Sequence, residues 1–171
     1  MDFYQVIKTR KSIRAYKPDP VADDALERIL EAGRIAPSAK NIQPWKFIVI
    51  KDQNIRNELV TACRNQMFIG QAPVVICAVA LEKIAWGNMG GYWSSYPVDI
   101  TIALDHIILA ATNEGLGTCW IGAYNEAEVK RILKIPEDVK VIALTPIGYP
   151  AQEPVERPRK NLSEITSIDS F

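Results

Sequence analysis

The sequence predicts a single α+β domain with few strands, and three observations support this fold class. The length of 171 residues corresponds to one domain. Hydrophobic residues make up 48% of the chain and charged residues 23%, which is typical of a globular protein and not of a disordered one. Amphipathic helical patterns alternate with short apolar runs typical of strands, and no repeat or low-complexity linker divides the chain.

The first half of the chain contains three helical patterns and two strand patterns. Asp2 is placed to cap a helix whose apolar positions are Phe3, Val6 and Ile7. A second helix is expected over residues 23–33, with a glycine near its end, and a third over residues 55–65. The runs WKFIVI (45–50) and PVVICAVAL (73–81) predict strands, the second of them buried.

The second half begins with a long helical pattern, VDITIALDHIILAATNEG, over residues 98–115. It is apolar nearly all round and ends in Gly115, so this helix should be largely buried. The remaining patterns predict a short strand over 118–124, a helix over 126–135 and a last strand over 139–148. The tail from Pro150 has a basic cluster but no periodic pattern of its own.

Charge and cysteine content exclude several classes of protein. Lys+Arg and Asp+Glu both count 20, so no net charge attracts nucleic acid or a membrane surface. The longest apolar run, residues 72–81, is too short to span a bilayer as a helix, and the first residues have no signal-peptide core. Cys63, Cys77 and Cys119 match neither a disulfide framework nor a zinc spacing. We therefore expect a cytoplasmic protein without a metal site.

Two basic clusters are candidates for anion binding: KTRKSIR at residues 8–14 and RPRK at residues 157–160. Such clusters usually form a solvated surface. Together they could instead hold a phosphate, because guanidinium groups bind phosphate oxygens bidentately and the hydroxyl of Ser12 adds a donor.

The loop of residues 82–97 contains Trp86, Tyr92, Trp93 and Tyr96 between glycines. A loop of this length in a compact domain is often functional. It is either a mobile surface loop with some rings in the core or an aromatic lid over a planar ligand, and the sequence leaves both interpretations open.

No conventional catalytic set is present. The segment GLGTCWIG differs from a dinucleotide-binding fingerprint, because Trp120 occupies the place of the third glycine and the segment follows a helix. His106 lies on the buried helical pattern, where a packed histidine is more common than a base. Any redox chemistry therefore has to come from a cofactor.

The motifs RKSIRAY, APSAKNIQPWKF, GLGTCWIGAY, IGYP and RPRK occur in this order and resemble the FMN-dependent nitroreductase family, in particular its short subgroup. The resemblance extends from Asp2 to about Ile165. It implies a nitroreductase-like α+β fold, with a small, mostly antiparallel central sheet flanked by helices, in an intertwined homodimer. Residues 1–171 would form one FMN-binding domain, with the tail of residues 150–171 packing on the partner subunit.

The resemblance also implies how FMN binds at the subunit interface. The first basic segment of one subunit contacts the phosphate, the ribityl chain and the pyrimidine edge, whereas the loop from Pro37 comes from the other subunit. Ala39 stands where many relatives have a second serine, Gln43 is expected to brace the loop, and either Asn65 or Gln66 meets the pyrimidine edge. The expected cofactor-binding residues are Arg10, Lys11, Ser12, Arg14, Pro37, Ser38, Ala39, Asn41, Gln66, Trp120, Ile121, Gly122, Arg157 and Arg159.

The activity implied by the resemblance is a ping-pong oxidoreduction. NADH or NADPH reduces the flavin at N5, and a nitroaromatic, a quinone or a similar small acceptor then takes its place. No side chain is assigned a catalytic role; Lys11 or Arg14 would stabilise the negative charge of the reduced flavin, and Trp93 and Tyr96 are assigned to the substrate site. The alternatives are an FMN sensor or storage protein without significant turnover, and a divergent branch that catalyses reductive dehalogenation or flavin breakdown.

Overall fold

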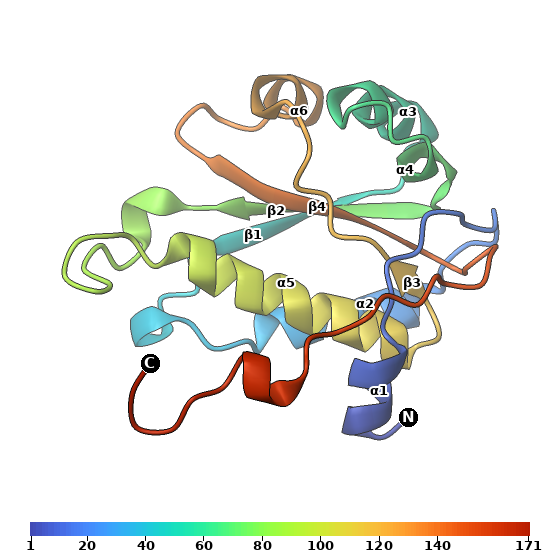
Figure 1. Ribbon diagram of the computed structural model, residues 1–171. Helices are drawn as coiled ribbons and strands as arrows, with labels where there is room; N and C mark the ends of the chain where they lie inside the picture. The colour runs from blue at the N-terminus through green and yellow to red at the C-terminus, as the bar shows by residue number, and fades with distance from the viewer.

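A four-stranded sheet lies between two layers of helices in the computed structural model, which describes residues 1–171 (Figure 1). Helices α2 and α5 cover one face of the sheet, and α3, α4 and α6 cover the other. The prediction of an α+β fold with few strands is confirmed. The elements are α1 (Phe3–Thr9), α2 (Asp23–Arg34), β1 (Trp45–Ile50), α3 (Gln53–Ala62), α4 (Phe68–Gln71), β2 (Val74–Ala80), α5 (Tyr96–Asn113), β3 (Gly117–Thr118), α6 (Glu126–Leu133) and β4 (Lys140–Gly148), with 3-10 turns at Ala39–Asn41, Glu82–Ile84 and Leu162–Glu164.

The strand order is β1-β2-β4-β3, and all three pairings are antiparallel. Every residue of β2 is buried, because this strand has neighbours on both sides and helices over both faces. Its side chains alternate between the two layers. Val74, Ile76 and Ala78 pack on the α2 and α5 side, whereas Val75 and Cys77 pack on the α3 and α6 side.

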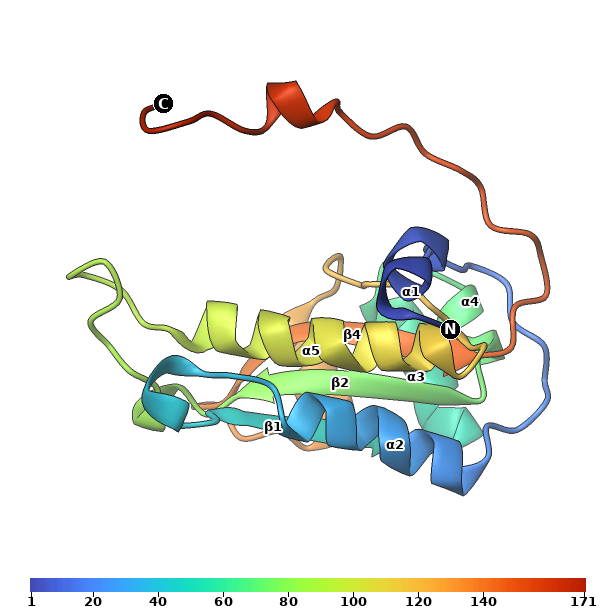
Figure 2. The same cartoon turned by 90° about the horizontal axis from the view of Figure 1, so that it is seen from below.

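Helix α5 is the long buried helix that the apolar pattern predicts. Ile100, Leu104 and Ile107 are completely buried, and the helix runs along one face of the sheet (Figure 2). Gly115 ends it as expected: the residue has a φ of +78°, and the next amide, that of Leu116, donates to the carbonyl of Ala111. This left-handed closure is favourable for glycine, which lacks the Cβ that makes it costly.

The predicted strand over residues 118–124 is wrong in its extent. Ladder pairing covers Gly117 and Thr118 and returns only as an isolated bridge between Ile121 and Leu144. If the register continued, Cys119 would lie opposite Pro146. A proline has no N–H to donate to the ladder, which accounts for the interruption.

The prediction of the third helix also needs correction in its extent. The third helix ends at Ala62, because Arg64 and Asn65 have φ values of +59° and +57° and the amide of Asn65 closes on the carbonyl of Val60. On α1, Asp2 forms the expected cap. Only Val6 of the predicted apolar stripe is buried, however, and Phe3 is 66% exposed.

The segment after α1 packs against the sheet, whereas the C-terminal tail extends away from the body. Ser12 bridges to Thr118 and Tyr16 bridges to Pro150, so the segment after α1 lies against the β3 end of the sheet. Beyond Pro150 the tail leaves the body as a separate arm (Figure 2). Its apolar side chains Leu162 and Ile168 are 72% and 86% exposed. No helix of the chain combines the length and the apolar character needed to cross a bilayer.

Candidate functional site

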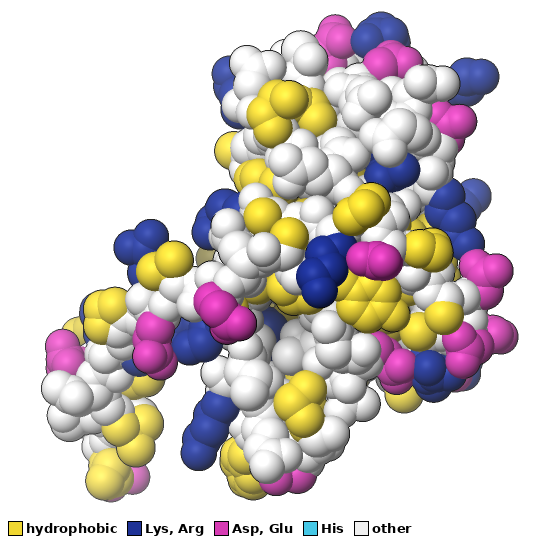
Figure 3. All heavy atoms as spheres, turned by 90° about the vertical axis from the view of Figure 1, so that its right-hand side faces the viewer, with side chains coloured by type: hydrophobic (Ala, Val, Ile, Leu, Met, Phe, Trp, Pro, Cys, Tyr) yellow, Lys and Arg dark blue, Asp and Glu magenta, His cyan; other side chains and the backbone are white.

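The structure brings the two basic clusters of the sequence together around one hollow of about 270 Å³. Dark blue Lys and Arg side chains border the space between the body and the tail (Figure 3). The lining residues are Arg10, Lys11, Ser12, Arg14, Gln152, Val155, Arg157 and Arg159. Five of these eight residues are cations, so the hollow is suited to a phosphate or another anion.

The position of this hollow depends on contacts around β3. The amide of Ile13 donates to the carbonyl of Thr118 over 2.8 Å, which fixes the chain beside Ser12. Ile13 itself is buried directly over Gly117, where a Cβ atom would lie only 2.6 Å from its Cγ1. A glycine is therefore needed there for the basic segment to approach the sheet.

Local charges around the hollow are only partly compensated. Lys11 forms one ion pair, with Glu156 at 3.4 Å. The buried thiol of Cys119 lies next to the same segment: burial raises its pKa, while the charge of Arg14 and a hydrogen bond from Ser12 act in the opposite direction. Cys119 is thus a neutral thiol beside a cationic site, and no nucleophilic role follows for it.

The segment from Trp120 to Gly122 follows β3 and so lies on the same side of the molecule as Ser12. Ile121 is buried and anchored to β4, whereas Trp120 is 40% exposed. Gln66 points its amide to the carbonyls of Cys63 and Ala123, at 2.9 and 3.3 Å. Its donors are therefore occupied within the protein. Asn65, in contrast, is exposed and makes no side-chain hydrogen bond, so it is the freer of the two residues to contact a ligand.

The other predicted cofactor segment, Pro37–Gln43, forms a compact loop with an unusual backbone. Lys40, Asn41 and Gln43 all have positive φ values, between 52° and 55°. Left-handed backbone at non-glycine residues costs on the order of 1 kcal/mol each and persists where other contacts impose it. The amide of Gln43 donates to Ser38 Oγ at 2.9 Å, and its side chain donates to Asn41 Oδ1 at 3.1 Å. Gln43 braces the loop as expected, and some of the loop's polar groups serve its own structure.

A residue that the sequence did not single out anchors this loop to α5. Asp99, on the first turn of α5, is buried, and its Oδ1 accepts from the amide of Ala39 at 2.9 Å. Its Oδ2 accepts from the hydroxyl of Ser95 at 2.7 Å. A carboxylate in an otherwise apolar helix, VDITIAL, was the available signal for this role.

The aromatic loop that contains the predicted substrate residues contacts the Pro37–Gln43 loop through Trp86. The Nζ of Lys40 is 5.5 Å from the ring centroid of Trp86, which connects the Pro37–Gln43 loop to the loop of residues 82–95. Trp93 is 37% exposed and pairs with Met89, while Tyr96 begins α5 half-buried. The rings of this loop are therefore partly covered, and the assignment of Trp93 and Tyr96 to a substrate site stays a prediction.

The two groups of predicted cofactor residues lie at opposite ends of α5. Asp99, which contacts Ala39, and Asn113, which accepts from the N-terminal amine of Met1, are 14 residues apart on this helix. At about 1.5 Å per residue, their separation is about 20 Å. Both ribbon views place the loop around Ser38 and helix α1 at opposite ends of α5 (Figures 1 and 2). One chain does not bring the two groups around the same ring system.

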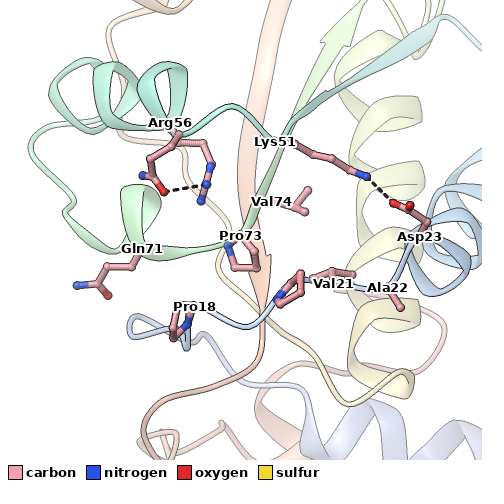
Figure 4. Close-up of a pocket in the computed structure, with 11 residues that line it drawn as sticks. Pro18, Val21, Ala22, Asp23, Lys51, Arg56, Gln71, Pro73 and Val74 are labelled. Carbon is pink, nitrogen blue, oxygen red and sulfur yellow. Dashed lines mark hydrogen bonds and ion pairs between the residues drawn. The ribbon is translucent and has the colours of Figure 1, made fainter.

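A larger hollow of about 630 Å³ lies elsewhere, between the segment before α2 and the start of α3 (Figure 4). Its one buried cation, Arg56, donates to Gln53 Oε1 and to the carbonyl of Ala72, and burial lowers its pKa. Lys51 on its rim is paired with Asp23 at 2.6 Å. These bonds hold α3 against the turn before β2, and none of the predicted site residues lines this hollow.

Comparisons with known proteins agree with the motif order. The sequence profile of the nitroreductase family matches residues 7–71 and 62–149. The chain belongs to the nitroreductase family. One relative in this family is the FMN reductase (NAD(P)H) of Bacillus subtilis, which is 35% identical over 185 residues, with 98% of this chain and 74% of the relative covered.

Solved structures of nitroreductases share the fold. A nitroreductase family protein of Clostridium novyi NT is 38% identical with a TM-score of 0.81, over 96% of this chain and 91% of that one. An FMN-dependent nitroreductase of Clostridium difficile is 28% identical with a TM-score of 0.82, over 99% of this chain and 100% of that one.

A more distant relative by sequence is an iodotyrosine deiodinase of Thermotoga neapolitana, which is 22% identical over 184 residues, with 93% of this chain and 94% of the relative covered.

Proposed function

We propose that this protein is an FMN-dependent oxidoreductase that uses NAD(P)H to reduce nitroaromatic, quinone or similar small acceptors in a ping-pong cycle. The observation that carries the proposal is the meeting of both basic clusters around one hollow, in a chain of the nitroreductase family. The relatives named FMN reductase (NAD(P)H) and FMN-dependent nitroreductase support the cofactor and the electron donor.

The donor set of the hollow fits the phosphate end of FMN. Arg10, Arg14, Arg157 and Arg159 offer planar guanidinium groups, and Ser12 offers a hydroxyl. Charge-assisted hydrogen bonds of this kind contribute about 1.5–3 kcal/mol each. Lys11 is already paired with Glu156, so we assign it a secondary part in phosphate binding and keep it as a candidate for charge near the ring.

Bound flavin supplies hydride acceptance and donation at N5, which no side chain of this chain can provide. The residues of the chain bind and orient. Gly122 has open space over its backbone, with Trp120 Nε1 no closer than 3.7 Å to an added Cβ, so its amide can approach a ligand. Arg14, an exposed cation of the basic hollow, is positioned to stabilise negative charge that develops on a bound ligand.

The working unit that we propose is a homodimer in which each site takes the basic hollow from one subunit and the Pro37–Gln43 loop from its partner. Two features support it. The groups of site residues are about 20 Å apart along α5 within a chain. Apolar side chains are also left uncovered on the tail and on α1, including Leu162, Ile165 and Phe3. A partner that covered them would also complete the site.

The test begins with the purified protein and its absorption spectrum before and after anaerobic addition of NADH. Bleaching of a flavin band is expected. FMN should bind far more tightly than riboflavin, which lacks the phosphate. Arg159→Ala should weaken FMN binding roughly ten- to hundredfold by removing one charge-assisted contact, with riboflavin binding little affected. Arg131 is an exposed arginine on α6, so Arg131→Ala is the matched control and should leave both affinities unchanged. Equal affinities for FMN and riboflavin would contradict the proposal.

A second candidate function is reductive dehalogenation, which the deiodinase relative favours at 22% identity. Turnover of an iodinated or brominated phenol by the NADH-reduced protein, with release of halide, would identify this branch. An FMN-loaded protein that neither NADH nor NADPH bleaches would instead identify a flavin sensor or storage protein.

A further inference from the structure

We propose that Asp99 is a positioning residue that holds the Pro37–Gln43 loop in its place on α5 and ties it to the aromatic loop of residues 82–95. The inference rests on the proposed function, because that function assigns the Pro37–Gln43 loop to FMN and the aromatic loop to the acceptor. It goes beyond that function because it names the shared anchor that sets their relative position.

The geometry of Asp99 shows why one residue can serve both loops. The side chain is 3% exposed, and each carboxylate oxygen has a separate partner. Oδ1 accepts from the backbone amide of Ala39 and Oδ2 from the hydroxyl of Ser95, which is itself 1% exposed. Ser95 in turn closes the aromatic loop, because its amide donates to the carbonyl of Trp86 at 2.8 Å.

The loop that Asp99 holds needs an external constraint. Three left-handed residues within Lys40–Gln43 are disfavoured in a free chain, and Ala39 immediately precedes them. Inside the loop, Gln43 bonds to Ser38 and Asn41. These internal bonds fix the shape of the loop but not its placement on the body, which is the part that the bond to Asp99 supplies.

A second contact links the same two loops at their outer side. Lys40 Nζ lies over the ring of Trp86 at 5.5 Å, on the solvent side of the Asp99 bonds. Two loops that are joined at a buried point and at an exposed point move as one unit. The placement of the acceptor-side aromatic residues is then coupled to the placement of the cofactor loop, and Asp99 is the buried point of this coupling.

The test compares Asp99→Ala, Asp99→Asn and Ser95→Ala, with Glu82→Ala as the control. Glu82 is an exposed carboxylate of the aromatic loop and makes no ion pair. In the apo protein, hydrogen exchange of the Ala39 and Ser95 amides is measured by NMR. Asp99→Ala should accelerate exchange at Ala39 and weaken FMN roughly tenfold. Asp99→Asn retains an oxygen for Ala39 and should restore most of both properties.

Ser95→Ala should leave Ala39 protected and FMN affinity near that of the wild type, but should accelerate exchange in residues 86–95. It should also change the ratio of kcat/KM values for a small and a large acceptor. This variant carries the test if Asp99→Ala does not fold. Unchanged exchange at Ala39 in Asp99→Ala, or Asp99→Asn as damaging as Asp99→Ala, would overturn the proposal.

The apo measurements keep this inference separate from the proposed function. A wild-type protein that binds no FMN would contradict the function, while the exchange rates at Ala39 would still report on the anchor. A wild-type protein that binds FMN, together with an Asp99→Ala variant of unchanged affinity and unchanged acceptor ratio, would overturn the inference alone.

Discussion

The absence of a side chain at Gly117 lets Ile13 pack closely on β3 and so positions the basic segment of the candidate site. A Cβ at this residue would lie 2.6 and 2.8 Å from Cγ1 and Cβ of Ile13, and a branched, buried side chain cannot move aside without displacing its own backbone. We expect Gly117→Ala to lower the free energy of unfolding by about 1–3 kcal/mol, as overpacking does. FMN affinity should fall as well, because Ser12 is the neighbour of Ile13 and would be displaced together with it.

The control for this prediction is Gly87→Ala. An added Cβ there meets no atom within 4 Å, and the backbone needs no positive φ. Denaturant unfolding followed by tryptophan fluorescence measures both variants. Equal stability of the two would show that the approach of Ile13 to β3 has no energetic weight.

The three cysteines should respond to alkaline pH rather than act as reactive groups. All are buried, and burial raises the pKa of Cys63 to about 11 and also raises the pKa values of Cys77 and Cys119. The folded chain therefore holds these protons more tightly than the unfolded chain, whose thiols titrate near 8.5. Their contribution to stability is complete below about pH 8.5 and is lost as the pH rises from there toward the folded pKa values.

Two measurements check this. At pH 8 the native protein should react with a thiol reagent far more slowly than the denatured protein, which exposes three thiols. The midpoint of urea unfolding should decrease between pH 8.5 and 11. Rapid labelling of a native cysteine at pH 8 would contradict the burial of at least one of them.

At the scale of elements, the loop of residues 82–95 is the segment whose role the sequence left open. It is closed by the bridge of Met89 with Trp93 and contacts the Pro37–Gln43 loop through Lys40. We expect Trp93→Ala to change the rate of the oxidative half-reaction while leaving FMN content intact, because Trp93 is partly exposed and is not part of the basic hollow. Tyr96→Ala should act in the same direction.

Stopped-flow reoxidation of the reduced protein by two acceptors of different size measures this effect. Glu82→Ala is the control, since Glu82 is an exposed carboxylate of the same loop that makes no ion pair. If both acceptors react at wild-type rates in Trp93→Ala, the loop is a structural element of the surface.

Elements also show where a local pattern stops being sufficient. The strands β1, β2 and β4 and the helices α2, α5 and α6 were predictable within a few residues, because burial on one or both faces imposes a period on the sequence. The extent of β3 was not, because it depends on Pro146 in another strand opposite Cys119. The short helix α4 has no period long enough to recognise.

At the scale of the molecule, the proposed homodimer predicts that two variants with different defects can restore a site together, which a monomer could not do. Arg10→Ala disables the basic hollow. Asn41→Asp keeps the acceptor for Gln43 and adds a negative charge to the partner's contribution. Each variant alone should have weak sites. Mixing them in equal amounts should restore an intact site in each heterodimer, about a quarter of all sites after random exchange.

FMN fluorescence titration of the mixture against each parent variant measures this recovery. Sedimentation of the wild type gives the second measurement, and a dimer is expected at micromolar concentration. A stable, FMN-loaded monomer under these conditions would contradict the shared site.

The sequence by itself determined the fold class, the order of the longer elements, the family and the two basic clusters, because periodicity and motif order are local properties of the chain. Only the tertiary structure decided which of these residues meet. It joined Arg10 with Arg159 across almost the whole sequence, separated them from Ser38 by the length of α5, and placed Asp99 under Ala39. Such meetings depend on how the helices pack on the two faces of the sheet, and no short stretch of sequence encodes a contact between residues 60 or more positions apart.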